Sequence, residues 1–295
     1  MILVLGASSF IGRRMFTTLG SSGAIGTHKS TPVPGSVHFD ATTMRLPDIL
    51  PAVSDISHAV ILYAETRIDI CKADLNRSYQ LNVDSTKRVI DDLSELGIKP
   101  VFFSSDWVFD GTKGNYLEKD TPAPTTTYGS QKLEVEQYLS NRCKDYLILR
   151  PARVFGTDPD DGSILSSWYQ QIQGNETIRC ARDQVFSPIH VDDVVKATKA
   201  VVDLDLGGVF HICNPEPCSR LEFLRTLLNC LGSKAHVIEC SIRDFEFLED
   251  RPLNLAMDPK KIIDATGLDF KTIESCCKEF SRNLTTNDSG SALKD

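Results

Sequence analysis

The regular alternation of short apolar runs with longer helix-like segments is the feature that most constrains the fold. Apolar runs predict strands at residues 2–6, 24–28, 36–42, 58–65, 99–109 and 146–156. The stretches between them include predicted helices at 11–23, 75–97 and 130–141. Apolar runs without period-two alternation are typical of strands buried on both faces. Strands that alternate with helices build right-handed βαβ units, so we predict an α/β fold with a doubly wound parallel sheet.

Composition limits the kinds of partner. The 295 residues carry a formal net charge of -8, and nine of them are cysteines. Proteins that bind nucleic acids or acidic membrane surfaces broadly carry a surplus of Lys and Arg. This chain carries a surplus of Asp and Glu, so we expect neither kind of partner. The chain shows no membrane span and no signal peptide pattern, which favours a cytoplasmic protein. The sequence contains no CxxC pair. We therefore predict that the cysteines are buried thiols and that they form no metal site.

The stretch GASSFIG at residues 6–12 follows the first predicted strand. A strand that turns into a helix leaves backbone N–H groups facing outwards, which suits a pyrophosphate. Gly6 allows a tight turn there, and Gly12 allows close packing of helix on strand. Ser9 stands where such loops carry a further glycine, and its hydroxyl is either simply accommodated or donates to a phosphate. Alone, the pattern fits both a cofactor loop and an ordinary turn.

The end of the second predicted strand bears on the choice of cofactor. NAD-binding proteins place a carboxylate there for the ribose 2′-hydroxyl. This chain instead carries His28, Lys29 and Ser30. These side chains suit the 2′-phosphate of NADP, although Lys29 also fits an ordinary solvated charge. We expect NADPH, with NADH as the alternative.

Tyr128 and Lys132 stand four residues apart on a predicted helix, so both side chains lie on one face. A nearby ammonium lowers the pKa of a phenol towards a range useful for proton transfer. Alone, the spacing also fits a surface pair. Just upstream, however, a predicted strand ends in Ser104-Ser105-Asp106. A serine that binds a carbonyl oxygen, a tyrosine that moves a proton and a lysine that tunes it together predict a hydride-transfer site.

These three motifs together resemble the extended short-chain dehydrogenase/reductase superfamily. Within it, SSDWVFDG at 104–111 is similar to the S-T-D-Y-V-F-D-G segment of dTDP-4-dehydrorhamnose reductases. Further similar segments lie at residues 64–74, 81–86, 150–156 and 251–262, so the resemblance spans about residues 1–270.

The resemblance implies a role for each matching residue. The implied catalytic residues are Ser105, Asp106, Tyr128 as proton donor and Lys132, which also holds the nicotinamide ribose. Predicted cofactor contacts, including those argued above, are Gly6, Ser8, Ser9, Phe10, Ile11, Gly12, His28, Lys29, Asp40, Ala41, Ala64, Thr66, Tyr128 and Lys132. Implied substrate contacts are Ser105, Asp106, Arg153 and Arg251, and the forked donors of Arg251 suit the diphosphate of a nucleotide sugar.

The chain departs from the family pattern at three positions. Ser9 replaces a glycine, Trp107 replaces a tyrosine, and Arg153 replaces a tryptophan in the pocket that reads the sugar. The leading hypothesis is an NADPH-dependent reductase of a 4-keto nucleotide sugar, as in dTDP-rhamnose biosynthesis. The alternatives are an epimerase or dehydratase that keeps its NAD, and a regulatory subunit like the β subunit of methionine adenosyltransferase. Retention of Ser105, Tyr128 and Lys132 favours an enzyme. The oligomeric state stays open, with a homodimer as one option.

The sequence pattern also divides the chain. Residues 1–156 are predicted to form the NAD(P)-binding Rossmann domain. Residues 157–282 are predicted to form mainly a smaller C-terminal substrate-binding lobe, with about 186–214 returning to the first domain. In that region we expect a helix at 164–175, a loop and helix at 186–204 capped by Asp192 or Asp193, a strand at 207–214, and a helix from Ser219. The polar residues 283–295 predict a disordered tail.

Overall fold

The apolar runs of the sequence form one parallel sheet in the computed structural model, which describes residues 1–20, 22–50 and 55–291. Its seven strands, in spatial order, are β11 (Gly208–Ile212), β6 (Leu147–Pro151), β5 (Lys99–Phe103), β4 (His58–Ile61), β1 (Ile2–Leu5), β2 (Ala24–His28) and β3 (Ser36–His38). Every pairing between neighbours is parallel. The strand order reverses direction beside β1, which confirms the doubly wound α/β class.

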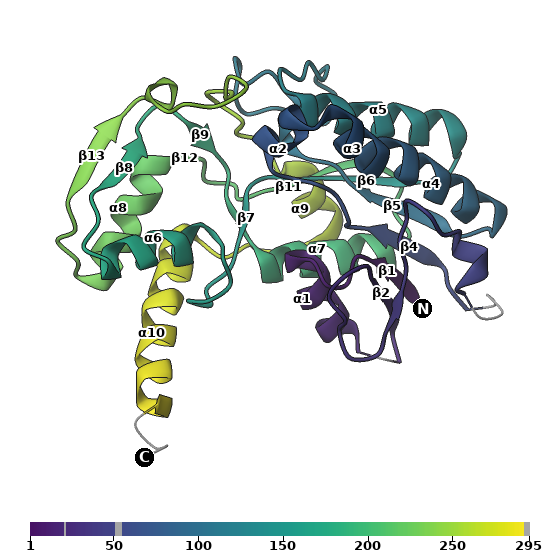
Figure 1. Cartoon of the computed structure of the whole chain (residues 1–295), viewed down its shortest axis with the longest axis horizontal. Coiled ribbons are helices and arrows are strands. Elements are labelled where there is room, and N and C mark those ends of the chain that lie inside the picture. The colour runs from purple at the N-terminus through teal and green to yellow at the C-terminus, as the bar shows by residue number, and fades with distance from the viewer. Residues whose placement is uncertain (21, 51–54, 292–295) are drawn as a thin grey trace.

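Helices cover both faces of this sheet (Figure 1). One face carries α1 (Phe10–Leu19), α7 (Val191–Asp203) and α9 (Lys260–Thr266), and the other carries α2 (Ile68–Ala73), α3 (Leu75–Tyr79), α4 (Ser85–Glu95) and α5 (Thr127–Arg142). Successive residues of β1 serve opposite faces, because side chains alternate along a strand. Val4 packs into the cluster with Val194 and Ile262, whereas Leu3 packs with Val89 and Leu139.

The smaller lobe packs around its own aromatic core beside the sheet (Figure 1). Trp168, Phe223 and Phe280 are buried in that core. The lobe contains α6 (Ile164–Gln173), α8 (Arg220–Leu231), α10 (Ile273–Ser291) and two short strand pairs, β8 (Ile178–Ala181) with β13 (Val237–Cys240) and β9 (Val185–Phe186) with β12 (Cys218–Ser219). A further pair, β7 (Val154–Phe155) with β10 (Ile189–His190), leads into it. Ser219 caps α8 in a capping box with Glu222, as expected for a helix that starts there.

Several predicted boundaries differ from those in the structure. The predicted helix at 75–97 is α3 and α4 joined by a π-helical turn, Gln80–Asp84. The predicted cap of α7 was wrong: the N-cap is His190, whose ring nitrogen accepts the N–H of Asp192 at 3.2 Å. Asp193 does not cap because its carboxylate accepts the backbone N–H of Lys271 at 2.8 Å instead.

The two lobes exchange chain segments. In the region 186–214, β11 is a strand of the large sheet and α7 packs on one face of that sheet. α9 packs on the same face, although the sequence assigned it to the smaller lobe as part of residues 157–282. α10 extends to Ser291, into the segment for which the sequence predicted a disordered tail. Residues 292–295 of that predicted tail lie outside the described residues.

All nine cysteines are unpaired thiols. Seven are buried, and Cys218 and Cys230 are partly exposed. Burial raises the pKa of Cys180 to about 11, so this thiol stays protonated. Across residues 1–20, 22–50 and 55–291, no three His, Cys, Asp or Glu side chains gather as a metal site. Within the same ranges, no helix has the length and apolar character needed to cross a bilayer.

Candidate active site

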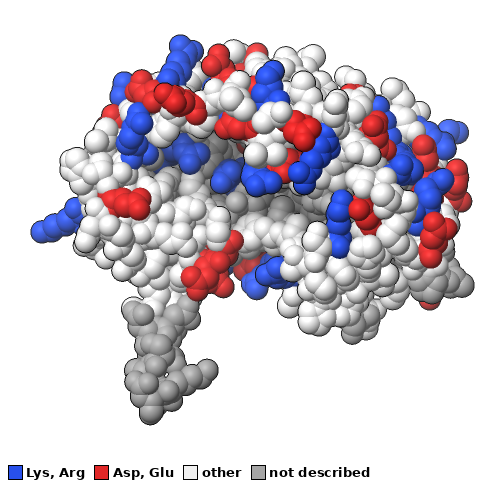
Figure 2. Space-filling view, in the orientation of Figure 1, with Lys and Arg blue, Asp and Glu red and all other residues white. Residues whose placement is uncertain are grey.

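A cavity of about 500 Å³ opens where the carboxyl ends of β1, β4 and β5 face the smaller lobe. The space-filling view shows this side of the molecule hollowed between the lobes, with basic side chains along the hollow (Figure 2). Ligands of open α/β sheets bind outside the carboxyl ends of strands where the strand order reverses. The fold therefore places the cavity where a dinucleotide site is expected.

The loop between β1 and α1 requires both of its glycines. Gly6 adopts a positive φ of 94°, and a side chain on it would meet the backbone nitrogen of Tyr63 at 3.0 Å. A Cβ on Gly12 would lie 2.1 Å from the carbonyl oxygen of Gly6, so Gly12 packs behind the loop rather than in the cavity wall. Ser9 is the N-cap of α1, because its Oγ accepts the N–H of Gly12 at 3.1 Å. Its side chain thus serves the helix.

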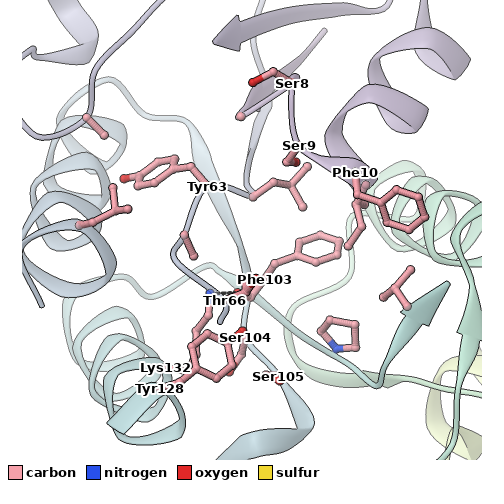
Figure 3. A pocket seen from close by; sticks show the side chains of 18 of the residues that line it. Ser8, Ser9, Phe10, Tyr63, Thr66, Phe103, Ser104, Ser105, Tyr128 and Lys132 are labelled. Atoms are coloured by element: carbon pink, nitrogen blue, oxygen red, sulfur yellow. Dashed lines mark hydrogen bonds between the residues drawn. The ribbon is translucent and has the colours of Figure 1, made fainter. Parts of the chain in front are cut away.

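The remaining predicted cofactor contacts line the same cavity. They are Ser8, Phe10, Ile11, Ala41, Ala64 and Thr66, together with Gly6 and Ser9. Figure 3 shows Ser8, Ser9 and Phe10 on one side of the cavity and the predicted catalytic residues on the other. The structure thus brings the loop at residues 6–12 and the helix with Tyr128 and Lys132 into one site.

The end of β2 contributes polar side chains to the cavity wall. The ring nitrogen Nδ1 of His28 lies 2.7 Å from the hydroxyl of Ser36. Lys29 Nζ lies 3.0 Å from a carboxylate oxygen of Asp40. Burial acts to raise the pKa of Asp40, but hydrogen bonds from Thr42 and Lys29 outweigh it and the pKa is lowered. Asp40 is therefore ionised, and it partly neutralises the lysine expected to select NADPH.

The opposite wall combines the end of β5 with the first turns of α5. The hydroxyl of Ser105 donates to Asp106 Oδ1 at 2.8 Å, and both residues are buried. Tyr128 and Lys132 are also buried and project from α5 towards Ser105 and Ser104 (Figure 3). Lys132 Nζ donates to the carbonyl oxygen of Phe103 at 2.7 Å.

Burial controls the protonation of this wall. It raises the pKa of the Tyr128 phenol well above its usual range, although a hydrogen bond with Ser105 opposes the shift. The expectation that Lys132 lowers this pKa was therefore wrong: its ammonium is directed at the carbonyl of Phe103, and burial of the phenol dominates. Burial also lowers the pKa of Lys132 to about 8 and raises that of Asp106 to about 7.

The two predicted substrate arginines lie in different places. Arg153 lines the cavity beside Asp106, whose negative charge acts on it. Arg251 lies outside the cavity wall, where its Nη2 donates to Asp69 Oδ2 at 2.7 Å. Its guanidinium also stacks 5.7 Å from the ring centre of Trp107, which does line the cavity.

Sequence reasoning missed a residue of the cavity wall, Ser104, and a charged residue outside that wall, Arg220. Ser104 lines the cavity with a buried hydroxyl that has no hydrogen-bond partner among the described residues, and its place beside Ser105 was the available signal. Arg220, at the start of α8, carries a positive charge that acts against that of Arg153. Among the described residues neither arginine forms an ion pair. No motif pointed to Arg220, because only the fold of the smaller lobe brings α8 to this side.

Comparison with known proteins decides the family. Residues 1–286 match the family described as the RmlD substrate binding domain. The chain belongs to this family. That confirms the resemblance predicted from the sequence, and membership in the RmlD family supports an oxidoreductase.

Relatives cover nearly the whole chain. The probable low-salt glycan biosynthesis reductase Agl14 of Haloferax volcanii is 25% identical over 288 residues, which cover 92% of this chain and 94% of that protein. The β subunit of methionine adenosyltransferase 2 from Rattus norvegicus is 25% identical over 286 residues, covering 92% and 84%. The crystal structure of dTDP-4-dehydrorhamnose reductase from Bacillus anthracis, in complex with NADP, has a TM-score of 0.81 at 21% identity and covers 95% of this chain and 97% of that one. This likeness agrees with the RmlD-like fold.

Proposed function

We propose that the protein is an NADPH-dependent reductase that converts the 4-keto group of a nucleotide sugar into an alcohol, in the manner of dTDP-4-dehydrorhamnose reductases. One observation carries the proposal: Ser105, Tyr128 and Lys132 lie on one wall of a cavity whose other wall is the loop from Gly6 to Ile11. A hydroxyl, a protonated phenol and a buried lysine opposite a dinucleotide loop suit transfer of a hydride and a proton.

The residues present fit a nicotinamide dinucleotide. Gly6 and Gly12 leave no room for side chains, so the loop backbone stays close and accessible for a pyrophosphate. His28 and Lys29 line the cavity at the end of β2 and would hold the 2′-phosphate of NADPH. The related Bacillus anthracis structure, which contains NADP, has the same fold over most of the chain. When bound, NADPH supplies the hydride.

The residues of the wall supply the remaining chemistry. The raised pKa keeps the phenol of Tyr128 protonated at neutral pH, so it is ready to donate. Its O–H bond breaks as a new O–H bond forms on the former carbonyl oxygen, and the carbon becomes that of an alcohol. The hydroxyl of Ser105, which donates to Asp106 before the reaction, stabilises the phenolate that remains when its proton turns to the phenol oxygen. Lys132 places a positive charge nearby while Phe103 fixes its position.

The arginines support a substrate with a diphosphate. Arg153 lies in the cavity wall, and the charge of Arg220 acts on it from the smaller lobe. The two guanidinium groups repel each other, and neither forms an ion pair among the described residues, although the charge of Asp106 acts on Arg153. A bound anion would stabilise both of them. The diphosphate of a nucleotide sugar has the required charge.

A second candidate is a regulatory subunit, because the relatives include the β subunit of methionine adenosyltransferase 2. The placement of Tyr128 beside Ser105 favours the reductase, since a subunit that only binds needs no buried proton donor. An epimerase or dehydratase is a less good fit, because the wall at the end of β2 has His28 and Lys29 in place of an acid that selects NAD.

The test is oxidation of NADPH with a panel of 4-keto nucleotide sugars that differ in base and sugar, including dTDP-4-dehydrorhamnose. We expect turnover with at least one of them, and its loss in Tyr128→Phe. If the protein binds NADPH but turns over none of the panel, and Tyr128→Phe behaves like the wild type, the regulatory role is correct and the reductase is excluded.

A further inference from the structure

A segment of the smaller lobe, residues 245–251, lies against the larger lobe beside the start of α5. It follows a short 3₁₀ turn, Ile242–Asp244. The backbone N–H of Leu248 donates to Asp69 Oδ1 at 3.0 Å, and Arg251 donates to the other oxygen of the same carboxylate at 2.7 Å. Asp69 lies in the first turn of α2, so the segment is fastened to the larger lobe at that point. We call residues 245–251 the bridging segment.

Glu249 of the bridging segment reaches the first residue of α5. Its carboxylate accepts the backbone N–H of Thr127 at 2.9 Å and the Thr127 hydroxyl at 2.8 Å. Lys72 Nζ lies 3.8 Å away, and only 10% of the Glu249 side chain is exposed. Thr126 already caps the N–H of Gly129, so Glu249 satisfies a further N–H that the helix itself leaves unpaired.

The first turn of α5 is also held from its side. A Cβ on Gly129 would lie 2.1 Å from the carbonyl oxygen of Trp107, so the helix rests directly on the turn that carries Asp106. Tyr128 lies between Thr127 and Gly129. The backbone of Tyr128 is therefore held on both sides. Gly129 packs against the Trp107 carbonyl within the larger lobe, and Thr127 is bound by Glu249 from the smaller lobe.

We propose that Glu249 is a positioning residue for the reaction: it fixes the first turn of α5 so that the phenol of Tyr128 stays beside Ser105. A carboxylate at this place also interacts favourably with the positive end of the helix. Glu249 does not touch the reacting atoms, so it acts through Tyr128. Its effect on rate rests on the proposed function, whereas its effect on the helix does not.

Three variants test this role in the full chain. Glu249→Ala removes the acceptor, Glu249→Gln keeps one carbonyl oxygen for Thr127, and Glu246→Gln removes a carboxylate from an exposed position of the same segment. The first readout is amide hydrogen exchange of the peptide that contains Thr127–Gly129. We expect exchange there to be about three- to tenfold faster in Glu249→Ala, which corresponds to the net loss of one hydrogen bond, and near wild type in the other two.

The second readout is NADPH oxidation with dTDP-4-dehydrorhamnose. We expect Glu249→Ala to lower kcat about tenfold or more with KM changed less than threefold, and Glu249→Gln to recover most of the rate. Unchanged exchange at 127–129 in Glu249→Ala overturns the proposal, as does an equal loss of rate in Glu249→Ala and Glu246→Gln. If the wild type itself turns over no substrate, the proposed reductase fails, and the exchange measurement still decides whether Glu249 holds the helix.

Discussion

Tyr128 combines two opposing influences on its proton. Burial raises the pKa of its phenol, and the hydrogen bond with Ser105 opposes that shift. The balance leaves a protonated phenol whose conjugate base is stabilised by one specific neighbour. Such a group donates a proton efficiently only when the reacting oxygen is within hydrogen-bond reach, which gives the first prediction.

Tyr128→Phe should lower kcat by about 10²–10⁴-fold, the usual contribution of a positioned proton donor. NADPH affinity should change less than about tenfold, because one lost hydrogen bond contributes a net of about 0.5–1.5 kcal/mol. The rate is followed by NADPH absorbance and the affinity by NADPH fluorescence. A variant that retains wild-type kcat would show that another group donates the proton.

Asp106 makes stability depend on pH in an unusual direction. Burial raises its pKa to about 7 in the folded protein, against about 4 in an unfolded chain. Between these values the folded state holds a proton that the unfolded state has released. The contribution of Asp106 to stability is therefore present at low pH and is lost as pH rises through about 4 to 7.

Asp106→Asn should remove this dependence. The difference in unfolding free energy between wild type and variant should shift by up to about 1.4 kcal/mol per pH unit across that range, in favour of the variant as pH rises. Urea unfolding at a series of pH values measures it. The same substitution at the exposed Asp250 should leave the slope unchanged; an Asp106→Asn protein with the wild-type slope would contradict the assignment.

At the scale of elements, α1 depends on Ser9 for its N-terminal cap. Ser9→Ala should lower the unfolding free energy by about 1 kcal/mol, the usual cost of losing a serine cap. NADPH affinity should change less than about threefold, because the hydroxyl is engaged with Gly12. Ser8→Ala, which removes no cap, is the control for stability. A tenfold loss of NADPH affinity in Ser9→Ala would instead show that the hydroxyl binds a phosphate.

Sequence predicted the elements that are specified locally and missed those specified by distant contacts. The loop at Gly6–Gly12 and the helix with Tyr128 and Lys132 were predictable because their spacing is itself the chemical requirement. The cap of α7 was not, since Asp193 is occupied by Lys271, which lies far along the chain. The pKa of Tyr128 was predicted with the wrong sign because burial cannot be read from a spacing of four residues.

At the scale of the whole molecule, the described cavity wall comes from residues 6–154, and the smaller lobe adds the charge of Arg220 from outside that wall. Arg153 lies where the chain leaves the sheet, and Arg220 begins a helix of the smaller lobe. Arg153→Met should raise KM for the nucleotide sugar about tenfold or more, since a hydrogen bond to a charged group contributes about 1.5–3 kcal/mol. NADPH affinity should change little. Arg182→Met, which changes an exposed arginine of the smaller lobe, is the control; equal effects of both variants would exclude a specific anion contact.

The seven-stranded sheet was predictable as a class because its buried strands read as continuous apolar runs. The position of residues on the smaller-lobe side of the cavity was not predictable, because it depends on how the short strands and helix caps of that lobe pack together. Arg251 illustrates this: its matching motif implied a substrate contact, yet the fold pairs it with Asp69 and stacks it on Trp107.

The buried thiols have a consequence for how the protein would respond to alkylating reagents. Cys71 lies in α2 and Cys143 just after α5, both in the larger lobe, whereas Cys180, Cys276 and Cys277 lie in the smaller lobe. A reagent that needs an accessible thiolate reaches them only when their lobe opens. Each lobe thus contains its own buried thiols. The order in which these thiols are alkylated under mild denaturant reveals which lobe unfolds first.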